Sequence, residues 1–342
     1  MGRGSRLALF LLLASASVAH ATENDATESE GEWVLIADLI IDNHAPFVVR
    51  DQNPLLAGVG LPSTMPSNQW SQFSSRIDYY WGSTALMQQQ GNEALLVDAE
   101  TREARLTIQG GISDRIGWQL QIPYRYTGGG SLDSFIDGWH DTFGLSEGAR
   151  SALPRDQIGI AYTRAGTRQL DVSSSSSGLG DIQASLGYEI QDSPRSTLTA
   201  WLNVKLPTGD ADELTGSGAT DVSLVLAGRR KLSRRWTAFG QAAVTYLGDG
   251  DLLPDQQRDV VWSGMAGVGA SVWRGLSLKA QIDAHTAAYD SNLDFFSDAV
   301  ILTVGGDYRF TDDWRLELGV SEDLAVEHSP DVVFILGLQH RW

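Results

Sequence analysis

Apolar and polar residues alternate along most of the chain from about residue 70 onward. Residues 116–127, 198–206 and 276–285 each place an apolar residue at every second position, as in Trp118 and Leu120. This period is that of a β-strand with one apolar and one polar face. A β-sandwich alternates in the same way, but its strands are usually shorter and its turns more even. The pattern therefore predicts long, two-faced strands.

The connections between the predicted strands are of two kinds. Short turns at 192–194, 274–275 and 311–313 each follow a second strand, while longer polar stretches such as 128–156 and 248–256 lie between them. Bacterial membrane barrels show this asymmetry, with short periplasmic turns and longer loops outside the cell. We therefore expect the long connections to lie outside the cell.

The predicted fold class is all-β. Counting strands between the connections gives about 14, and an even number places both ends of a barrel on the periplasmic side. The pair at 156–174 is the weakest, and if it forms an extracellular hairpin the barrel has about 12 strands. Only helices and closed barrels satisfy every backbone polar group in hydrocarbon, and after residue 21 no apolar stretch reaches the length of a transmembrane helix. We predict a transmembrane antiparallel up-and-down β-barrel at 70–342 with a short N-terminal extension.

The first 21 residues have the order of a secretory signal peptide. Arg3 and Arg6 precede an apolar run at 7–16, and Ala19-His20-Ala21 supplies the small residues of a cleavage site. The alternative, an N-terminal membrane anchor, lacks a long apolar continuation or a stop-transfer pattern. Residues 22–69 then form a periplasmic extension, which we prefer, or a plug that enters the pore.

The carboxyl end carries a second export signal. The alternation at 332–338 continues to a terminal Trp342, which is similar to the C-terminal strand signature that the outer-membrane assembly machinery reads. Aromatic residues near predicted strand ends, such as Trp236 and Trp273, suit the interfacial girdles of a membrane barrel, although they would also suit packing in a soluble sheet. We predict a location in the outer membrane of a Gram-negative bacterium. The expected partners are outer-membrane lipids, lipopolysaccharide and the assembly machinery.

Composition excludes several classes of function. The formal charge of −18 and the pI near 4.6 argue against nucleic acid as a partner, because phosphate binding needs a basic surface. The chain has no cysteine, so neither disulfides nor thiolate metal sites are available. Acidic residues at 210–213 form either a solvated loop, which we prefer, or a calcium site. We predict no cofactor and no metal site.

Candidate catalytic groups are scattered. His285 near Asp290, Ser291 and Asn292 is the strongest group, since a serine hydrolase needs a hydroxyl within reach of an imidazole and a third group that orients it. No motif supports this arrangement, and His140 is the other histidine that such an enzyme would use. We predict that the protein is not an enzyme, with a lipid-modifying enzyme as the least favoured alternative.

The long connection at 128–156 contains an amphipathic pattern of helical period. Leu132, Phe135, Ile136 and Trp139 recur at helical spacing. The predicted helix folds inward as a constriction, lies on the membrane as a lid, or packs over the barrel rim.

The polar face of the strands carries charges of both signs. The predicted pore-lining residues are Arg76, Asp78, Arg105, Arg125, Lys205, Asp221, Lys279, Asp283, Asp307, Arg309, Arg315 and Glu317, with Glu103 and Asp181 on the same face. Such charges either form a cross-lumen network that rigidifies the barrel or line a wet pore, and the sequence leaves both open. The wall side chains of a barrel of this width do not fill its lumen. Water, the acidic, polar leader at residues 22–32 or an inward loop must therefore occupy the lumen.

Short motifs distributed over most of the mature chain carry a family resemblance. They are Gln52-Asn53-Pro54-Leu55-Leu56, Leu61-Pro62, Gly138-Trp139-His140, Gly178-Leu179-Gly180-Asp181, Leu206-Pro207-Thr208-Gly209 and Leu214-Thr215-Gly216-Ser217-Gly218. With these motifs the chain resembles a proteobacterial family catalogued as domain of unknown function 3187. The resemblance implies an exported, barrel-like protein and supplies no activity.

Two functions fit these features. The leading hypothesis is a passive pore or uptake channel for a small solute, in which the lumen charges set selectivity. The alternative is a structural or surface-interaction barrel with a closed lumen.

Overall fold

The computed structural model describes residues 45–56, 58–63, 65–66, 73–130, 132, 157–324 and 329–342. All of them belong to one unit, Asp38–Trp342. The predicted signal peptide and the predicted loop helix from residue 133 onward lie outside the described residues, so both stay predictions.

Fifteen strands and two short 3-10 helices make up the described chain. The strands are β1 (Ser74–Gln90), β2 (Glu93–Ser113), β3 (Ile116–Gly128), β4 (Gly159–Arg164), β5 (Thr167–Val172), β6 (Ser176–Leu179), β7 (Gln183–Asp192), β8 (Ser196–Lys205), β9 (Asp221–Lys231), β10 (Trp236–Tyr246), β11 (Val260–Trp273), β12 (Leu276–His285), β13 (Ala299–Arg309), β14 (Trp314–Asp323) and β15 (Val332–Arg341). The 3-10 helices are η4 (Pro254–Gln256) and η5 (Asp294–Phe296).

Twelve of these strands form a closed antiparallel ring. The order around it is β1, β2, β3, then β7 to β15 in sequence, and β15 pairs with β1 from Ser74↔Arg341 to Ser83↔Val332. The predicted all-β antiparallel barrel is therefore confirmed, with twelve strands rather than about fourteen. The predicted pair at 156–174 is a hairpin, because β4 pairs with the Glu93–Asp98 part of β2 beyond the ring and β5 pairs only with β4.

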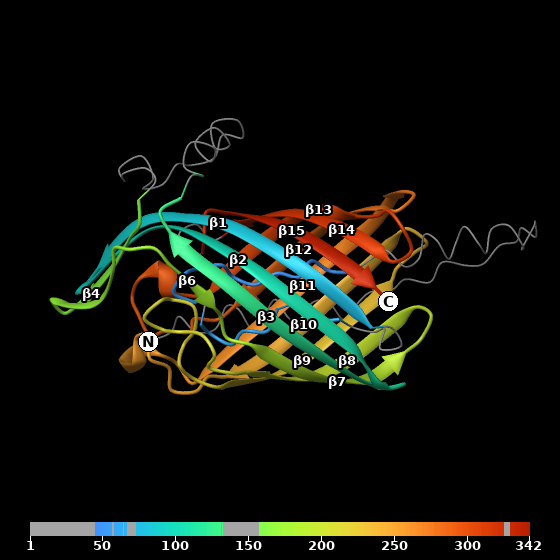
Figure 1. The fold of residues 1–342 in the computed structure, drawn as a ribbon, viewed down its shortest axis with the longest axis horizontal. Helices are drawn as coiled ribbons and strands as arrows, with labels where there is room; N and C mark the ends of the chain where they lie inside the picture. The colour runs from blue at the N-terminus through green and yellow to red at the C-terminus, as the bar shows by residue number, and fades with distance from the viewer. Residues whose placement is uncertain are drawn as a thin grey trace, which may run out of the picture. The chain divides into compact units, whose positions relative to one another are not determined.

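The two ends of the ring differ. The connections β2–β3, β7–β8, β9–β10, β11–β12 and β13–β14 are short and lie at the end that carries the carboxyl terminus, which we call the turn end (Figure 1). The long connections, the β4–β5 hairpin and both 3-10 helices lie at the opposite end, which we call the loop end. All of the short turns predicted from the sequence lie at the turn end.

The wall of the ring is apolar outside and polar inside. Ile77, Leu224, Trp262 and Leu278 point outward and are each more than half exposed. Side chains that point inward and are buried include Thr107, Gln121, Asn203, Thr245, Ser277 and Thr303. Soluble domains bury their apolar face instead, so this wall is built to contact hydrocarbon and to satisfy its backbone groups within the closed ring.

No helix in the described residues has the length and apolar character needed to cross a bilayer.

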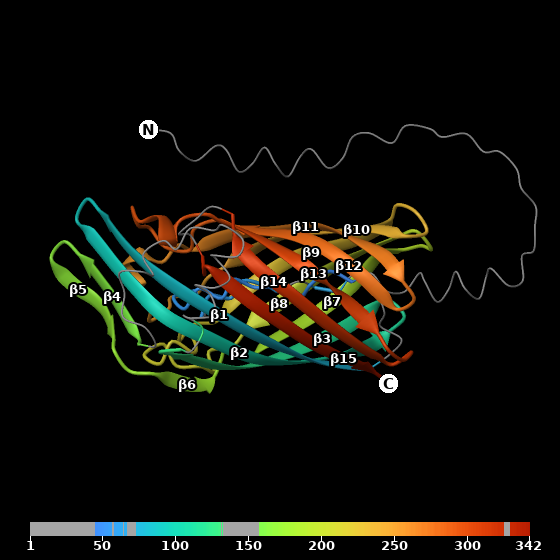
Figure 2. The same ribbon diagram turned by 90° about the horizontal axis from the view of Figure 1, so that it is seen from above.

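The described residues between 45 and 66 lie inside the ring, and we call this segment the luminal loop (Figures 1 and 2). Its backbone N–H groups at Phe47 and Met65 donate to inward-facing Gln281 of β12 and Gln241 of β10, at 2.9 and 2.8 Å. Both ends of the loop lie toward the turn end, where Ala45 and residues 65–66 line one cavity. The loop therefore rises toward the loop end, turns, and returns.

The loop end is closed by an apolar core, which we call the apolar cap. Its members are Leu55, Leu56, Val59, Leu61, Leu86, Leu95, Val97, Ala99, Ile160, Tyr162, Leu214, Leu247, Leu252, Leu253, Val261, Ala288, Tyr289, Leu293, Phe295 and Phe296. Phe296 makes edge-on ring contacts with Tyr162 of β4 and with Tyr289, at centroid distances of 5.3 and 5.6 Å. The cap thus joins the turn of the luminal loop, the β4–β5 hairpin and the long connections.

Candidate functional site

The predicted pore-lining residues gather into three buried charged clusters inside the ring. Ten of the twelve belong to these clusters and are almost fully buried. The other two are less buried. Asp283 is partly buried and accepts a hydrogen bond from Gln281 Nε2 at 2.9 Å, and Arg309 is partly buried at the turn end of β13.

The first cluster joins β1 to β12, β13 and β14. It consists of Arg76, Asp78, Lys279, Asp307, Arg315 and Glu317. Arg76 pairs with Asp78 at 2.6 Å and also with Glu317, and Lys279 joins Glu317 to Asp307, at 3.1 Å from the latter. Buried charges need partners of this kind, because the loss of hydration is costly. The cluster also holds the luminal loop, since Lys279 Nζ donates to the carbonyl oxygen of Ala45 at 3.2 Å.

The second cluster joins β2 and β3. Glu103 accepts from Arg105 Nε and Arg125 Nε, each at 2.7 Å. The Arg105 guanidinium also lies over the ring of Tyr80, 5.0 Å from its centroid. Tyr80 in turn donates its hydroxyl to the carbonyl oxygen of Val48 at 2.6 Å, so this cluster also reaches the luminal loop.

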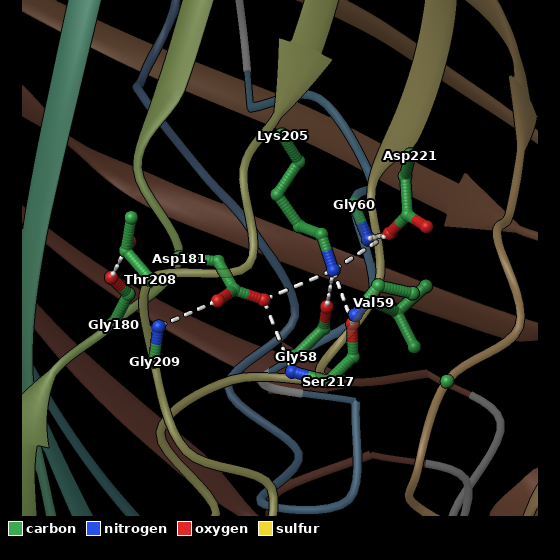
Figure 3. Close-up of polar contacts among 12 residues, drawn as sticks. Gly58, Val59, Gly60, Gly180, Asp181, Lys205, Thr208, Gly209, Ser217 and Asp221 are labelled. Atoms are coloured by element: carbon green, nitrogen blue, oxygen red, sulfur yellow. Dashed lines mark hydrogen bonds and ion pairs between the residues drawn. The ribbon is translucent and has the colours of Figure 1, made fainter.

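We call the third cluster the Lys205 junction (Figure 3). It lies inside the ring, at the loop-end terminus of β8. The Lys205 ammonium is fully buried and lies 2.9 Å from a carboxylate oxygen of both Asp181 and Asp221. It also donates to Gly58 O at 2.7 Å and to Ser217 Oγ. One cation therefore holds the ring, a long connection and the turn of the luminal loop together.

The Asp181 carboxylate binds the connection between β8 and β9. It accepts from the backbone N–H of Gly209 at 2.8 Å and of Ser217 at 3.0 Å (Figure 3). Beside it, Thr208 Oγ1 donates to the carbonyl oxygen of Gly180 at 2.8 Å. The motifs at 178–181, 206–209 and 214–218, which lie apart in the sequence, therefore meet at this junction.

The Asp221 carboxylate binds the luminal loop. It accepts from Gly60 N at 2.8 Å and from Gly248 N at 2.9 Å. A Cβ at position 60 would lie 2.5 Å from Asp221 Cβ, and one at Gly58 would lie 2.5 Å from the carbonyl carbon of Gly216. Glycine is needed at both positions because only its backbone can approach so closely.

A further polar contact connects the luminal loop to β12. His285 Nε2 lies 3.0 Å from Asp51 Oδ2, and its Nδ1 lies 3.0 Å from the carbonyl oxygen of Thr286. Ser291 instead donates to Glu93. The hydrolase arrangement considered around His285 is therefore not formed, because both ring nitrogens are engaged elsewhere and the serine faces a different partner.

Tyr289 anchors the turn of the luminal loop within the apolar cap. Its hydroxyl donates to Leu55 O at 3.3 Å. Burial raises the pKa of the Tyr289 phenol well above its ordinary value, and the nearby Asp221 carboxylate adds to this. The hydroxyl therefore stays protonated and remains a donor.

Small cavities remain around the luminal loop. One of about 80 Å³ opens near the turn end, between the loop and inward-facing Gln109, Gln119 and Gln121. A second of about 10 Å³ lies beside Glu103, and the two share no lining residue. These two cavities between described residues are on the scale of a few water molecules.

The sequence placed the charges on the lumen side but did not reveal the partners on the luminal loop. Asp51, Gly58 and Gly60 make their contacts through one carboxylate and two backbone groups, and no pattern of charge or period marks them. The only available signal was the Asn-, Gly- and Pro-rich composition of 51–67.

Comparison with known proteins gives a family and a fold. Residues 40–342 match the family described as protein of unknown function (DUF3187). The chain belongs to this family. The resemblance drawn from the short motifs is confirmed, and the DUF3187 match covers the luminal loop as well as the whole ring.

Three solved structures similar to this DUF3187 chain are described as channels or porins. The COG4313 outer membrane channel from Pseudomonas putida F1 has a TM-score of 0.56 at 14% identity, over 80% of this chain and 97% of that one. The NanC porin gives a TM-score of 0.45 at 11% identity, over 79% and 100%. The CymD monoaromatic hydrocarbon channel gives 0.41 at 11%, over 87% and 98%. No curated protein matches. The likeness to the first structure shows the outer-membrane β-barrel fold.

Proposed function

We propose that this protein is an outer-membrane channel for a small solute, with the luminal loop as its gate. The loop end faces outward and the turn end faces the periplasm, as in barrels with short periplasmic turns. The polar, two-signed inner wall supports a path for a hydrated solute once the loop moves. The proposal includes no catalytic step.

One observation carries the proposal: the luminal loop lies inside the ring without being part of its wall. The ring is closed by backbone pairing of β1 with β15 and β2, whereas the loop is attached through hydrogen bonds from its backbone to wall side chains such as Gln241 and Gln281. Each such contact is worth about 0.5–1.5 kcal/mol net, because water replaces it when it breaks. The loop can therefore move while the wall stays intact.

The apolar cap supports a second candidate, a barrel whose lumen stays closed. Leu55 and Leu56 of the luminal loop are buried in the cap, and the Lys205 junction fixes the loop just beneath them. In that case the acidic long connections would form a surface that meets lipopolysaccharide-bound cations or a partner.

Conductance in planar bilayers distinguishes the two functions. We would record the mature chain, a variant in which residues 46–65 are replaced by a short Gly-Ser linker, and a lockable variant, Ser63→Cys with Gln121→Cys. Ser63 Oγ accepts from Gln121 Nε2 at 2.8 Å, so a short bis-thiosulfonate cross-linker, which forms a reducible disulfide with each cysteine, spans the pair, and the chain has no other cysteine. We expect brief openings from the mature chain, larger currents from the replacement variant, and openings that stop on cross-linking and return with reductant.

The matched control joins two wall residues. Ser185 and Asn203 lie on the neighbouring strands β7 and β8 with side-chain oxygens 2.7 Å apart, so Ser185→Cys with Asn203→Cys places the same linker on the wall alone. Cross-linking there should leave the openings unchanged. A folded replacement variant without current would favour the closed barrel, whereas currents that persist unchanged after locking would show that the luminal loop is not the gate.

A further inference from the structure

The charges of the ring are segregated at its turn end. The stretches 193–201, 228–238 and 270–277 carry seven cations and no acidic residue. We call these cations the basic arc: Arg195, Arg229, Arg230, Lys231, Arg234, Arg235 and Arg274. The nearest acidic residue along the chain is Asp192, which borders the arc. This local charge is opposite in sign to the net charge of the chain.

The three stretches lie side by side. They form the turns β7–β8, β9–β10 and β11–β12, which belong to consecutive strand pairs of the ring. Lys231 N donates to Arg195 O at 2.8 Å, and Ser271 N donates to Arg235 O at 2.9 Å, so each turn contacts the next strand pair. The arc is therefore one continuous surface.

Five members of the arc are exposed and without an internal counter-ion. Arg195, Arg230, Arg234, Arg235 and Arg274 make no ion pair with any described residue. By contrast, the exposed Arg258 at the loop end lies 3.6 Å from Asp290. Like charges on neighbouring turns repel one another, and an anionic ligand from outside the chain would relieve this repulsion.

Interfacial side chains border the arc on the lipid-facing wall. Trp273 is 74% exposed and Trp236 is 49% exposed, with Leu232 and Val272 also exposed beside them. Tryptophan prefers the headgroup level of a bilayer, where its ring is half in hydrocarbon and its N–H is in water. The arc therefore lies at the level of lipid headgroups rather than in open solvent.

The connections of the loop end are acidic, so that end of the ring does not attract anions. The connections at 209–217, 248–259 and 290–298 expose Asp210, Asp212, Glu213, Asp249, Asp251, Asp255, Asp259, Asp290, Asp294 and Asp298, with Arg258 as their only described cation. Attraction to a negatively charged membrane surface is thus confined to the turn end.

We infer that the basic arc binds anionic phospholipid headgroups in the membrane leaflet that surrounds the turn end. A guanidinium donates two parallel hydrogen bonds to phosphate oxygens, and several arginines beside interfacial tryptophans match the phosphodiester and net charge of phosphatidylglycerol. A zwitterionic headgroup has the same phosphate but no net charge, so it binds more weakly. The site requires only that the wall spans a membrane and does not depend on the gate.

Native mass spectrometry of the purified full barrel in a nonionic detergent tests this site. The probes are phosphatidylglycerol, phosphatidylcholine with matched acyl chains, and soluble glycerophosphate. We expect phosphatidylglycerol to be retained in preference to phosphatidylcholine, with retention falling as salt rises. Arg234→Gln with Arg274→Gln should weaken phosphatidylglycerol binding about 30-fold, at roughly five-fold for each cation near the surface.

The matched control removes two arginines of the loop end. Arg168 and Arg258 are about half exposed, as their side chains are 51% and 47% accessible. Arg168→Gln with Arg258→Gln should leave phosphatidylglycerol binding unchanged. Equal retention of the two lipids by the unaltered protein, equal loss in both double variants, or no salt dependence would overturn the inference. Glycerophosphate binding as tight as phosphatidylglycerol would show a free-anion site instead.

Discussion

Replacing Lys205 by methionine would test whether the Lys205 junction holds the luminal loop in place. Methionine keeps most of the side-chain volume and removes the charge. The substitution leaves Asp181 and Asp221 buried without their shared cation, and it leaves Gly58 O without its donor. The ring is fixed by backbone pairing, so the luminal loop and the β8–β9 connection are the parts that can move to admit water.

The size of the effect follows from the contacts that remain. Removing one partner from a buried ion pair costs about 3–5 kcal/mol. Asp181 keeps the backbone N–H donors of Gly209 and Ser217. Asp221 keeps those of Gly60 and Gly248. These remaining hydrogen bonds favour the lower end of that range. A cost of about 3 kcal/mol raises the population of the open loop about 150-fold, at a factor of ten for every 1.4 kcal/mol.

The assay uses a single reporter cysteine on the luminal loop. Ser63 is 1% exposed and the chain has no native cysteine, so Ser63→Cys reacts with a soluble thiol reagent only when the loop opens. We expect Lys205→Met to raise the labelling rate about 100-fold, close to the ratio of open populations. Heat-dependent gel mobility would verify that the barrel itself stays folded.

A neutral junction is the informative control. Adding Asp181→Asn and Asp221→Asn to Lys205→Met removes the two uncompensated charges, while the single amide oxygen of each asparagine keeps one of the two backbone N–H donors, so the labelling rate should return part of the way. If Lys205→Met labels at the original rate in a folded barrel, the Lys205 junction does not hold the loop. If the neutral triple variant labels as fast as the single variant, charge is not the cause.

Two further predictions concern packing around the luminal loop. Gly58→Ala should also speed labelling of the reporter cysteine, because the added Cβ would lie 2.5 Å from backbone atoms of Gly216, at a cost of about 1–3 kcal/mol. The control Gly178→Ala should leave the labelling rate unchanged, because its Cβ would lie at an ordinary 3.6 Å from Thr215. Equal labelling rates in the two variants would refute this prediction. Phe296→Ala should lower the free energy of unfolding by about 3–5 kcal/mol, since Phe296 is 2% exposed in the apolar cap; thermal unfolding followed by circular dichroism measures this. The control Phe310→Ala, at an exposed residue, should change the stability little. Similar losses of stability in the two variants would show that the apolar cap does not contribute.

The wall of the barrel could be predicted because its physical requirement is local. Every strand must turn an apolar side chain to hydrocarbon at each second position, as Leu276 and Leu278 do, and this period is visible in the sequence. The same alternation placed Lys205 and Glu317 on the inner face. Their place on the inner face follows from the period, whereas the period leaves open whether they are buried or line a wet pore.

The strand count and the contacts of the luminal loop could not be predicted for a different reason. The β4–β5 hairpin has strand-like residues, but whether it enters the ring depends on the length of β2, which extends 21 residues and offers the hairpin an edge beyond the residues that pair with β3. Several contacts of the luminal loop join residues more than 140 positions apart, such as Gly58 and Lys205, and one of the two partners is often a backbone atom. No side-chain pattern encodes such a pairing.

The return path of residues 45–66 bears on how the barrel is assembled. Both described ends of the segment lie at the turn end of the ring, so the segment forms a re-entrant loop. No free chain end therefore has to be threaded through the closed ring. The segment can slide in or withdraw as one piece, whatever is attached ahead of residue 45. Wall closure and filling of the interior are thus separable steps.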